Sequence, residues 1–541
     1  MNAAAETDKK EGGPAERRAI AGRAGLVGAG TLVSRVLGLG RDLVLAAFFP
    51  RAATDLFFVA FTIPNALRQL LAEGALASSF VPVLAKVEQE EGPTAAERFY
   101  ANLRGAMWVV LIGTCVLGVA AAPWLCELFA AGFHARPGAF ERTVAVTRAV
   151  FPYLLFMGLA ALGAGALQTR KRFGVAAFAP ALLNVAMIVC AIALAPVLAR
   201  HGFDPLYALA VGALVGGLLQ VWAQMPDLRR AGFTAPLGLD FSDPRLREVV
   251  KRIAPMTLGL MIYEIDLVLS RRFLSQAGEG ANSWFYYAQR LCDFPQGIFS
   301  LALATATLPS LARLVAKGDR AEVASTAAHA FRLALWVGLP ATALLVGLAR
   351  PIVVAVFARG AFDQASVDGT TAALVVQGLG VVVVAMVRQL VPLYYALGDT
   401  KTPVWISGID LLAFVAIALS LRGPWGHVGV SAAVTGSSIV QMALLMMLLR
   451  QRLPELRWSM IGKSLVTAGA AAIGAAALGF GAALAVRPLS GMRAIGGLIP
   501  AAVGAVVFAI AYLALGRLFG NEEQAEIVAG LRRRLRRRRA A

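Results

Sequence analysis

Long apolar runs separated by short polar segments make up most of this chain. Apolar stretches of about 20 residues or more, enough to cross a bilayer as a helix, recur from residue 22 to residue 519. The pattern predicts an all-α polytopic membrane protein with about fourteen transmembrane helices. The predicted spans are 22–49, 56–88, 100–131, 142–169, 174–199, 204–225, 246–275, 283–316, 323–358, 364–397, 401–421, 427–451, 462–486 and 493–519.

The composition supports this fold class and indicates which kind of molecule the basic residues contact. Hydrophobic residues make up 58% of the chain and charged residues only 15%, against roughly 25% charged residues in an ordinary soluble domain. The net charge of +19 would suggest nucleic acid if it covered a soluble face. The basic residues instead lie mainly between apolar runs and in Arg532–Arg539, which argues against nucleic acid and favours anionic phospholipid at a basic tail.

The distribution of lysine and arginine predicts the orientation. With an even number of spans both termini lie on one side, and the tails and connections on that side hold most of the 51 basic residues. Positively charged connections stay in the cytoplasm. We therefore expect both termini to be cytoplasmic.

A weak internal repeat predicts two lobes of parallel orientation. Residues 57–86 resemble residues 284–313, and Val81–Pro82 falls on Leu308–Pro309. Parallel repeats around a central path are a transporter plan, although chance similarity between apolar helices is the alternative. The predicted organisation is a tail at 1–21, an N-lobe at 22–232, a C-lobe at 233–451, an added helix pair at 452–520 and a basic tail at 521–541.

Arginines within the predicted spans are the first candidate binding residues. They include Arg35, Arg41, Arg68 and Arg290. Each charge near the bilayer centre costs about 2.5–3.5 kcal/mol on insertion scales, so such residues usually serve a function. A net positive cavity favours an anionic passenger, and guanidinium groups bind phosphate through two hydrogen bonds. The alternatives are structural ion pairs and, for Arg41, an interfacial position.

Charged neighbours of these arginines are candidate gate or charge partners. Asp42 could pair with Arg35 or Arg41, and Asp55 lies near the outer end of its span, where it could pair with a cation. Glu73 and Arg388 complete this predicted set.

Acidic residues in the second half are candidates for a coupling-ion site. Asp266 and Asp410 lie within predicted spans, and Asp399 lies at the entrance to one. They could bind Na⁺ or H⁺. Structural salt bridges, to Arg388 or to Arg271 and Arg272, are an equal alternative.

The sequence contains no convincing catalytic or metal motif. The GKS sequence at 462–464 lacks the first glycine of a phosphate-binding loop, because Arg457 holds that position. The histidines and cysteines have no zinc spacing. We therefore expect a transporter, not an enzyme, that has no organic cofactor and is driven by the membrane potential or an ion gradient.

Several motifs resemble those of the MurJ (MviN) lipid II flippases. They are SRVLGLGRD at 34–42, TDLFFVAFTIPNALR at 54–68, AEGALASSFVP at 72–82, YYAQRL at 286–291 and GDTKTP at 398–403. The resemblance runs in order from about residue 22 to about residue 450. The first two motifs are long and specific, whereas the last two predicted helices match in number more than in sequence.

The resemblance implies both a fold and an activity. The fold is that of the multidrug/oligosaccharidyl-lipid/polysaccharide (MOP) exporters, which includes the multidrug (MATE) antiporters. The activity is movement of the undecaprenyl-pyrophosphate-linked peptidoglycan precursor, lipid II, from the inner to the outer leaflet of the bacterial cytoplasmic (inner) membrane by alternating access. The expected partners are lipid II and proteins of cell-wall synthesis or division, and the expected state is a monomer.

The resemblance also implies roles for individual residues. The functional arginines of the family fall on Arg35, Arg41, Arg68 and Arg290, its outer-gate aspartate on Asp55 and its second-helix glutamate on Glu73. Arg388 stands where a lysine often occurs. The last two helices would border a groove for the lipid tail, and the family's sodium site suggests Asp266 and Asp399. Gln289 and Gln69 depart from the family pattern at positions where an acid and a second arginine can occur.

Two other transport functions compete with this interpretation. A flippase for another lipid-linked oligosaccharide would share the basic cavity, so only the specific motifs argue against it. A MATE-type drug antiporter would have twelve helices and an acidic or aromatic cavity.

Overall fold

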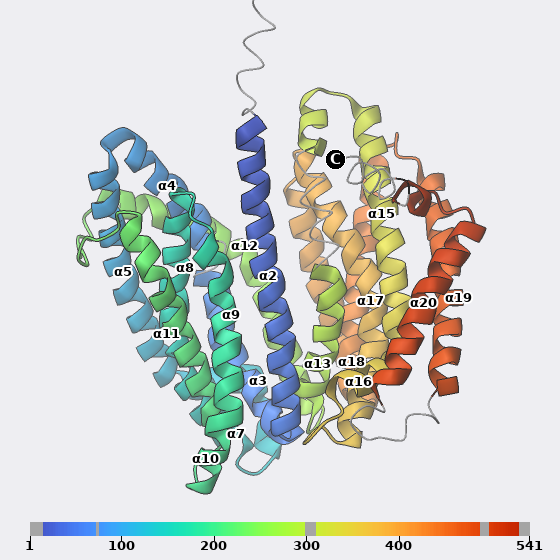
Figure 1. The fold of residues 1–541 in the computed structure, drawn as a ribbon, viewed down its shortest axis with the longest axis horizontal. Coiled ribbons are helices and arrows are strands. Elements are labelled where there is room, and N and C mark those ends of the chain that lie inside the picture. Colours follow the sequence, from blue (N-terminus) through green and yellow to red (C-terminus); the bar gives the residue numbers. More distant parts are fainter. Residues whose placement is uncertain (1–13, 72–74, 298–309, 487–496, 528, 530–541) are drawn as a thin grey trace, which may run out of the picture. The chain divides into compact units, whose positions relative to one another are not determined.

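The computed structural model describes residues 14–71, 75–297, 310–486, 497–527 and 529, and every regular element in these ranges is a helix (Figure 1). The chain divides into two compact units. Unit 1 comprises Met1–Phe48, Leu56–Phe129 and Arg136–Glu264, and unit 2 comprises Phe49–Asp55, Ala130–Ala135 and Ile265–Ala541. The predicted all-α fold class is therefore confirmed.

Unit 1 is a bundle in which α11 packs against α8 and α9, and α2 packs against α9. Small residues permit these close approaches, as is usual between membrane helices. A Cβ atom on Gly216 of α11 would lie 2.6 Å from Leu183 Cα of α9. The helices of this unit are α2 (Pro14–Phe48), α4 (Ala75–Glu91), α5 (Pro93–Ala120), α6 (Ala122–Ala130), α7 (Ala139–Val150), α8 (Tyr153–Thr169), α9 (Gly174–Val189), η2 (Cys190–Leu194), α10 (Ala195–Arg200) and α11 (Leu206–Arg230).

Unit 2 is built around α17, which packs against α13, α15 and α18, while α19 packs against α15 and α20. Its elements are η1 (Ala131–Ala135), α13 (Ala281–Pro295), α15 (Arg320–Gly347), α16 (Ala349–Phe357), α17 (Gln364–Ala396), α18 (Lys401–Arg452), α19 (Trp458–Val486) and α20 (Leu498–Leu518). The last residue of α6, Ala130, belongs to unit 2, and two further helices contribute longer parts to both units. The first turn of α3 (Arg51–Leu71) belongs to unit 2, and α12 (Pro244–Gln276) passes from unit 1 to unit 2 after Glu264.

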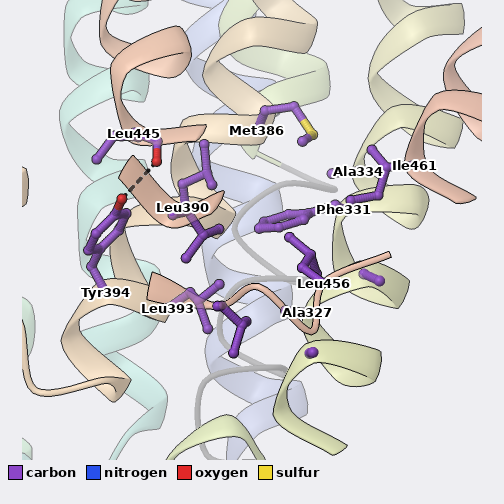
Figure 2. Packing of buried hydrophobic residues seen from close by; sticks show 14 of the residues in the cluster. Ala327, Phe331, Ala334, Met386, Leu390, Leu393, Tyr394, Leu445, Leu456 and Ile461 are labelled. Atoms are coloured by element: carbon purple, nitrogen blue, oxygen red, sulfur yellow. Dashed lines mark hydrogen bonds between the residues drawn. The ribbon is translucent and has the colours of Figure 1, made fainter. Parts of the chain in front are cut away.

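The apolar core of unit 2 joins four helices (Figure 2). Phe331 of α15 packs in one cluster with Leu390 of α17 and Ile461 of α19. The cluster also contains one buried polar link, in which the Tyr394 hydroxyl donates to the backbone oxygen of Leu445 on α18 at 2.7 Å. Because the hydroxyl has a partner, Tyr394 can be fully buried without leaving an unsatisfied polar group.

Nine stretches of the described residues are long and apolar enough to cross a membrane. The protein is therefore a multi-pass membrane protein, and the number fourteen stays a prediction. The predicted spans 401–421 and 427–451 form the single element α18, broken at Gly426, whose φ of 54° is non-helical. Conversely, the predicted span 56–88 contains parts of two helices, α3 and α4.

The predicted organisation into tails, lobes and an added helix pair stays a prediction, because the units follow spatial contact and not the sequence repeat. The start of the predicted basic tail packs within unit 2. Glu522 and Glu523 form salt bridges with Arg332 of α15, and Lys463 of α19 pairs with Glu522 at 2.8 Å. The arginine run 532–539 lies outside the described residues.

Candidate functional site

Two of the predicted binding arginines lie on α2 in unit 1. Arg41 is only 6% exposed and donates through Nε and Nη2 to Asp42 Oδ1, at 3.0 and 2.8 Å. The Asp42 side chain is fully buried. The structure thus confirms Arg41 as a partner of Asp42. Arg35, two turns earlier, is half-buried.

α9 holds this part of α2 in place. The Asn184 amide donates to the backbone oxygen of Ser34 at 3.1 Å. The same amide group lies 3.8 Å from the position that a Cβ atom of Gly38 would occupy. α2 remains helical through Gly38 and Gly40, so the positions of Arg35 and Arg41 are fixed by helix geometry and by contact with α9.

The third arginine, Arg68, lies on α3 within unit 1. Its Nε donates to Asn65 Oδ1 at 3.0 Å, one turn before it and next to Pro64. The Glu264 carboxylate on α12 is buried and interacts electrostatically with Arg68. Sequence reasoning did not connect Glu264 to Arg68, because Arg68 lies almost two hundred positions earlier. Glu73 lies outside the described residues.

Asp55 caps α13 within unit 2. Its carboxylate accepts hydrogen bonds from the Gly280 backbone at 2.7 Å, from the Ser283 backbone at 2.8 Å and from the Ser283 hydroxyl at 2.9 Å. The side chain is fully buried. A carboxylate at a helix N-terminus satisfies amide groups that have no partner in the helix and complements the helix dipole. The predicted gate residue therefore positions the helix that carries Arg290.

Arg51, which sequence reasoning missed, lies one turn before Asp55. It forms salt bridges with Glu279 at 3.1 Å and with Asp363. Asp363 in turn caps α17 by accepting from the Ser366 backbone at 2.9 Å. Burial raises the pKa of Asp363, but the hydrogen bonds from Ser366 and Arg51 outweigh burial and hold that pKa below its usual value. The first turn of α3 thus ties together the starts of α13 and α17.

Arg290 lies beside an aromatic side chain and within reach of a second arginine. Its Nε donates to the Tyr286 hydroxyl at 3.1 Å, and its guanidinium lies 5.3 Å from the centre of the Tyr286 ring. Arg271 of α12, only 5% exposed, lies 5.9 Å from the same ring. A ring within about 6 Å of two guanidinium groups attracts both through cation–π interaction. Arg271 was considered only as a salt-bridge partner of the acids, so its place beside Tyr286 is new.

Arg388, the remaining predicted charge partner, lies on α17 in unit 2. It donates through Nη1 to the backbone oxygen of Gln296, directly after α13, at 3.2 Å. This hydrogen bond links α17 to the C-terminal end of the helix that carries Arg290.

The three candidates for a coupling-ion site have different surroundings in the structure. Asp266 of α12 and Asp410 of α18 interact electrostatically, and Asp410 lies near Ser437. Asp399 instead caps α18, accepting from the Lys401 and Thr402 backbones at 3.1 and 3.0 Å, and pairs with Arg452 at 2.8 Å.

The surroundings of Asp399 fit a structural role. Burial raises its pKa, but the Thr402 hydrogen bonds and the Arg452 charge outweigh burial and hold the pKa below its usual value. Within the described part of the chain, no cluster of three or more histidine, cysteine or acidic side chains could hold a metal ion. A cation at Asp266 and Asp410 would therefore need hydroxyl or backbone oxygens as further ligands.

Comparisons with known proteins agree on one family. The sequence profile described as "Lipid II flippase MurJ" matches residues 44–490. The lipid II flippase MurJ of Burkholderia cenocepacia is 35% identical over 453 residues, which cover 81% of this chain and 87% of the relative. A probable lipid II flippase MurJ of Vibrio cholerae is 34% identical over 428 residues, or 78% of this chain and 81% of the relative.

Solved structures support the fold. A lipid II flippase MurJ in an inward closed conformation superposes with a TM-score of 0.72 at 21% identity, covering 91% of this chain and 99% of that one. An inward-facing MATE transporter of the MOP superfamily gives a TM-score of 0.63 at 15% identity, covering 78% and 95%. Both solved structures resemble the fold of this chain, but the sequence profile and the curated relatives match only one of the two families. The chain belongs to the lipid II flippase MurJ family.

Proposed function

We propose that this protein flips lipid II from the inner to the outer leaflet of the bacterial cytoplasmic membrane, with both termini in the cytoplasm. Membership of the family supports the substrate, and the intramembrane arginines support the way it is held. The proposal is a transporter without a catalytic step or an organic cofactor. It works by alternating access and as a monomer.

The observation that carries this proposal is the placement of the guanidinium groups. Unit 1 holds Arg35, Arg41 and Arg68 on helices made largely of apolar residues, and unit 2 holds Arg290 beside Tyr286. A pyrophosphate carries negative charge that these groups can bind through paired hydrogen bonds. The lipid tail would remain in the bilayer, bordered by α19 and α20, which pack against each other.

We further propose that the return step is driven by the membrane potential or by Na⁺ or H⁺ bound at Asp266 and Asp410. Their electrostatic contact within unit 2 supports a cation there. A potential of 100 mV supplies about 2.3 kcal/mol per unit charge moved. Anionic phospholipid at the basic tail and proteins of cell-wall synthesis or division complete the proposed partners.

The test is a flipping assay on purified protein in proteoliposomes with fluorescent lipid II, with and without a membrane potential. Arg35→Ala and Arg290→Ala should abolish flipping but leave membrane insertion intact. Arg313→Ala, at an exposed position, is the matched control and should flip normally. Normal flipping by Arg35→Ala or Arg290→Ala would refute the proposed binding role, and flipping of another lipid-linked oligosaccharide in preference to lipid II would refute the proposed substrate.

A further inference from the structure

The connection between α11 and α12 is a coil fixed to the side of α5, with both partners in unit 1. The carboxylate of Glu97 on α5 accepts three hydrogen bonds from it through one oxygen, from the Thr234 backbone, the Thr234 hydroxyl and the Ala235 backbone, each 2.7 Å long. These hydrogen bonds hold the N-terminal part of the coil, at Thr234 and Ala235, against α5.

The next residues of the coil are held equally firmly. The Gly238 backbone donates to the Ala101 oxygen at 3.1 Å. The Asn102 side chain pairs with the backbone of Asp240, accepting from its N–H at 2.6 Å and donating to its oxygen at 2.7 Å. A Cβ atom on Gly105 would lie 1.7 Å from the Gly238 oxygen, so only glycine at 105 allows this approach. The coil has a defined conformation and a defined face toward α5.

Three apolar side chains of the coil are exposed. Leu237 is 52% exposed, Leu239 is 61% exposed and Phe241 is 56% exposed. Along the coil they alternate with Gly238 and Asp240, whose backbone groups bond to α5. Because α5 fixes the backbone, these side chains stay largely exposed, and only Leu239 also reaches α5, where its Cδ2 atom lies 3.3 Å from the position that a Cβ atom of Gly105 would occupy. A group of exposed large apolar side chains on a short, fixed segment marks an interaction surface.

Two features of the surroundings identify a lipid bilayer as the partner. The apolar surface of α5, a candidate membrane span, continues at Val109, which is exposed and about 6 Å along the helix from Gly105. Arginines flank the coil: Arg98 is exposed one turn before Asn102, and Arg247 is exposed one turn after Asp243. An apolar face continuous with a membrane span and edged by cations fits the boundary between lipid headgroups and acyl chains.

We propose that residues 236–241 form a membrane-interface anchor. Leu237, Leu239 and Phe241 insert into the leaflet at which α5 begins, and Arg98 and Arg247 contact lipid phosphates. The anchor sets the depth of the connection between α11 and α12 in the membrane. This inference does not depend on the transported substrate, because it concerns only the outer surface of unit 1.

The test uses full-length protein in which the native cysteines are replaced and a single cysteine carries an environment-sensitive fluorophore. The label is placed at Leu239, or at Leu237, in vesicles of phosphatidylethanolamine and phosphatidylglycerol. Ser242→Cys is the matched control, because Ser242 is exposed and lies in the same connection. We expect blue-shifted emission at 237 and 239, quenching by nitroxides on the acyl chains, and severalfold lower quenching by aqueous iodide than at 242.

Two results would overturn the anchor. One is equal iodide access at 237, 239 and 242 in vesicles. The other is shielding that arises only after a cell extract is added, because this would assign the surface to a protein partner. A folded control variant, Leu239→Ser, separates anchoring from stability: its melting temperature in detergent should stay close to that of the parent protein, since the Leu239 side chain is 61% exposed.

Discussion

The Asp55 carboxylate lies 2.7 Å from the Gly280 backbone nitrogen and so caps the helix that carries Arg290. The two residues are 225 positions apart in the sequence. The first turn of α3 therefore helps to fix the direction of α13 and, through it, the position of an arginine proposed to bind pyrophosphate.

We predict that Asp55→Ala destabilises the protein by about 1–3 kcal/mol, because it leaves buried N–H groups at the start of α13 without their carboxylate. Thermal unfolding in detergent measures this change. Asp319→Ala is the matched control: Asp319 caps α15 by accepting from Glu322 at 2.9 Å, but at an exposed position. Water can replace that cap, so the control should shift the melting temperature less. Equal shifts for both variants would contradict this account.

The pair formed by Arg41 and Asp42 allows two roles of Arg41 to be tested separately. One is the binding of lipid II, and the other is the stability of the fold. Arg41→Gln should lower the melting temperature, because it removes a guanidinium from a fully buried carboxylate. The double variant Arg41→Gln/Asp42→Asn should regain much of that stability but should not flip lipid II. Recovery of flipping in the double variant would show that Arg41 serves only to neutralise Asp42.

Tyr286 offers a test of how Arg290 is held. Tyr286→Phe removes the hydrogen bond to Arg290 but keeps the ring that Arg290 and Arg271 both approach. We expect a small loss of lipid II flipping for Tyr286→Phe and a large loss for Tyr286→Leu, which removes the ring and its cation–π attraction.

Arg290→Lys is the companion variant. A lysine keeps the charge but cannot form paired hydrogen bonds with a phosphate. Lipid II binding to the purified protein should therefore fall well below that of the parent. Full activity in Arg290→Lys would mean that charge alone is sufficient at this position.

The sequence predicted the helices well because the bilayer imposes simple rules on length and hydropathy. The break between two predicted spans near residue 424 follows from the local sequence, and the structure has it at Gly426. Three-dimensional partners were much harder to predict. Asp55 was expected to pair with a cation, whereas its capping of α13 depends on a fold-level contact. Arg51 was missed for the same reason, because Glu279 and Asp363 lie far from it in the sequence.

Asp399 gives a prediction about pH. Its folded-state pKa is held below the ordinary value of about 3.9. A lowered pKa contributes stability that is fully present above the unfolded-state pKa and is lost as the pH falls through the folded-state pKa. Asp399→Asn should therefore lower the melting temperature at pH 7, and the difference from the parent should shrink below about pH 4. A difference that stays constant with pH would contradict the ion pair with Arg452.

The electrostatic interaction between Asp266 and Asp410 predicts a cation that stabilises the folded protein. Two acidic side chains that repel each other gain stability when a cation lies between them, and a ligand that binds only the folded state raises the melting temperature with its concentration. We expect Na⁺ to raise the melting temperature of the parent protein at constant ionic strength, with choline as the replacement cation. Asp410→Asn should remove this response, while Asp399→Asn, which affects a helix cap instead, should keep it. A response that survives Asp410→Asn, or that disappears in Asp399→Asn, would place the cation elsewhere in the protein.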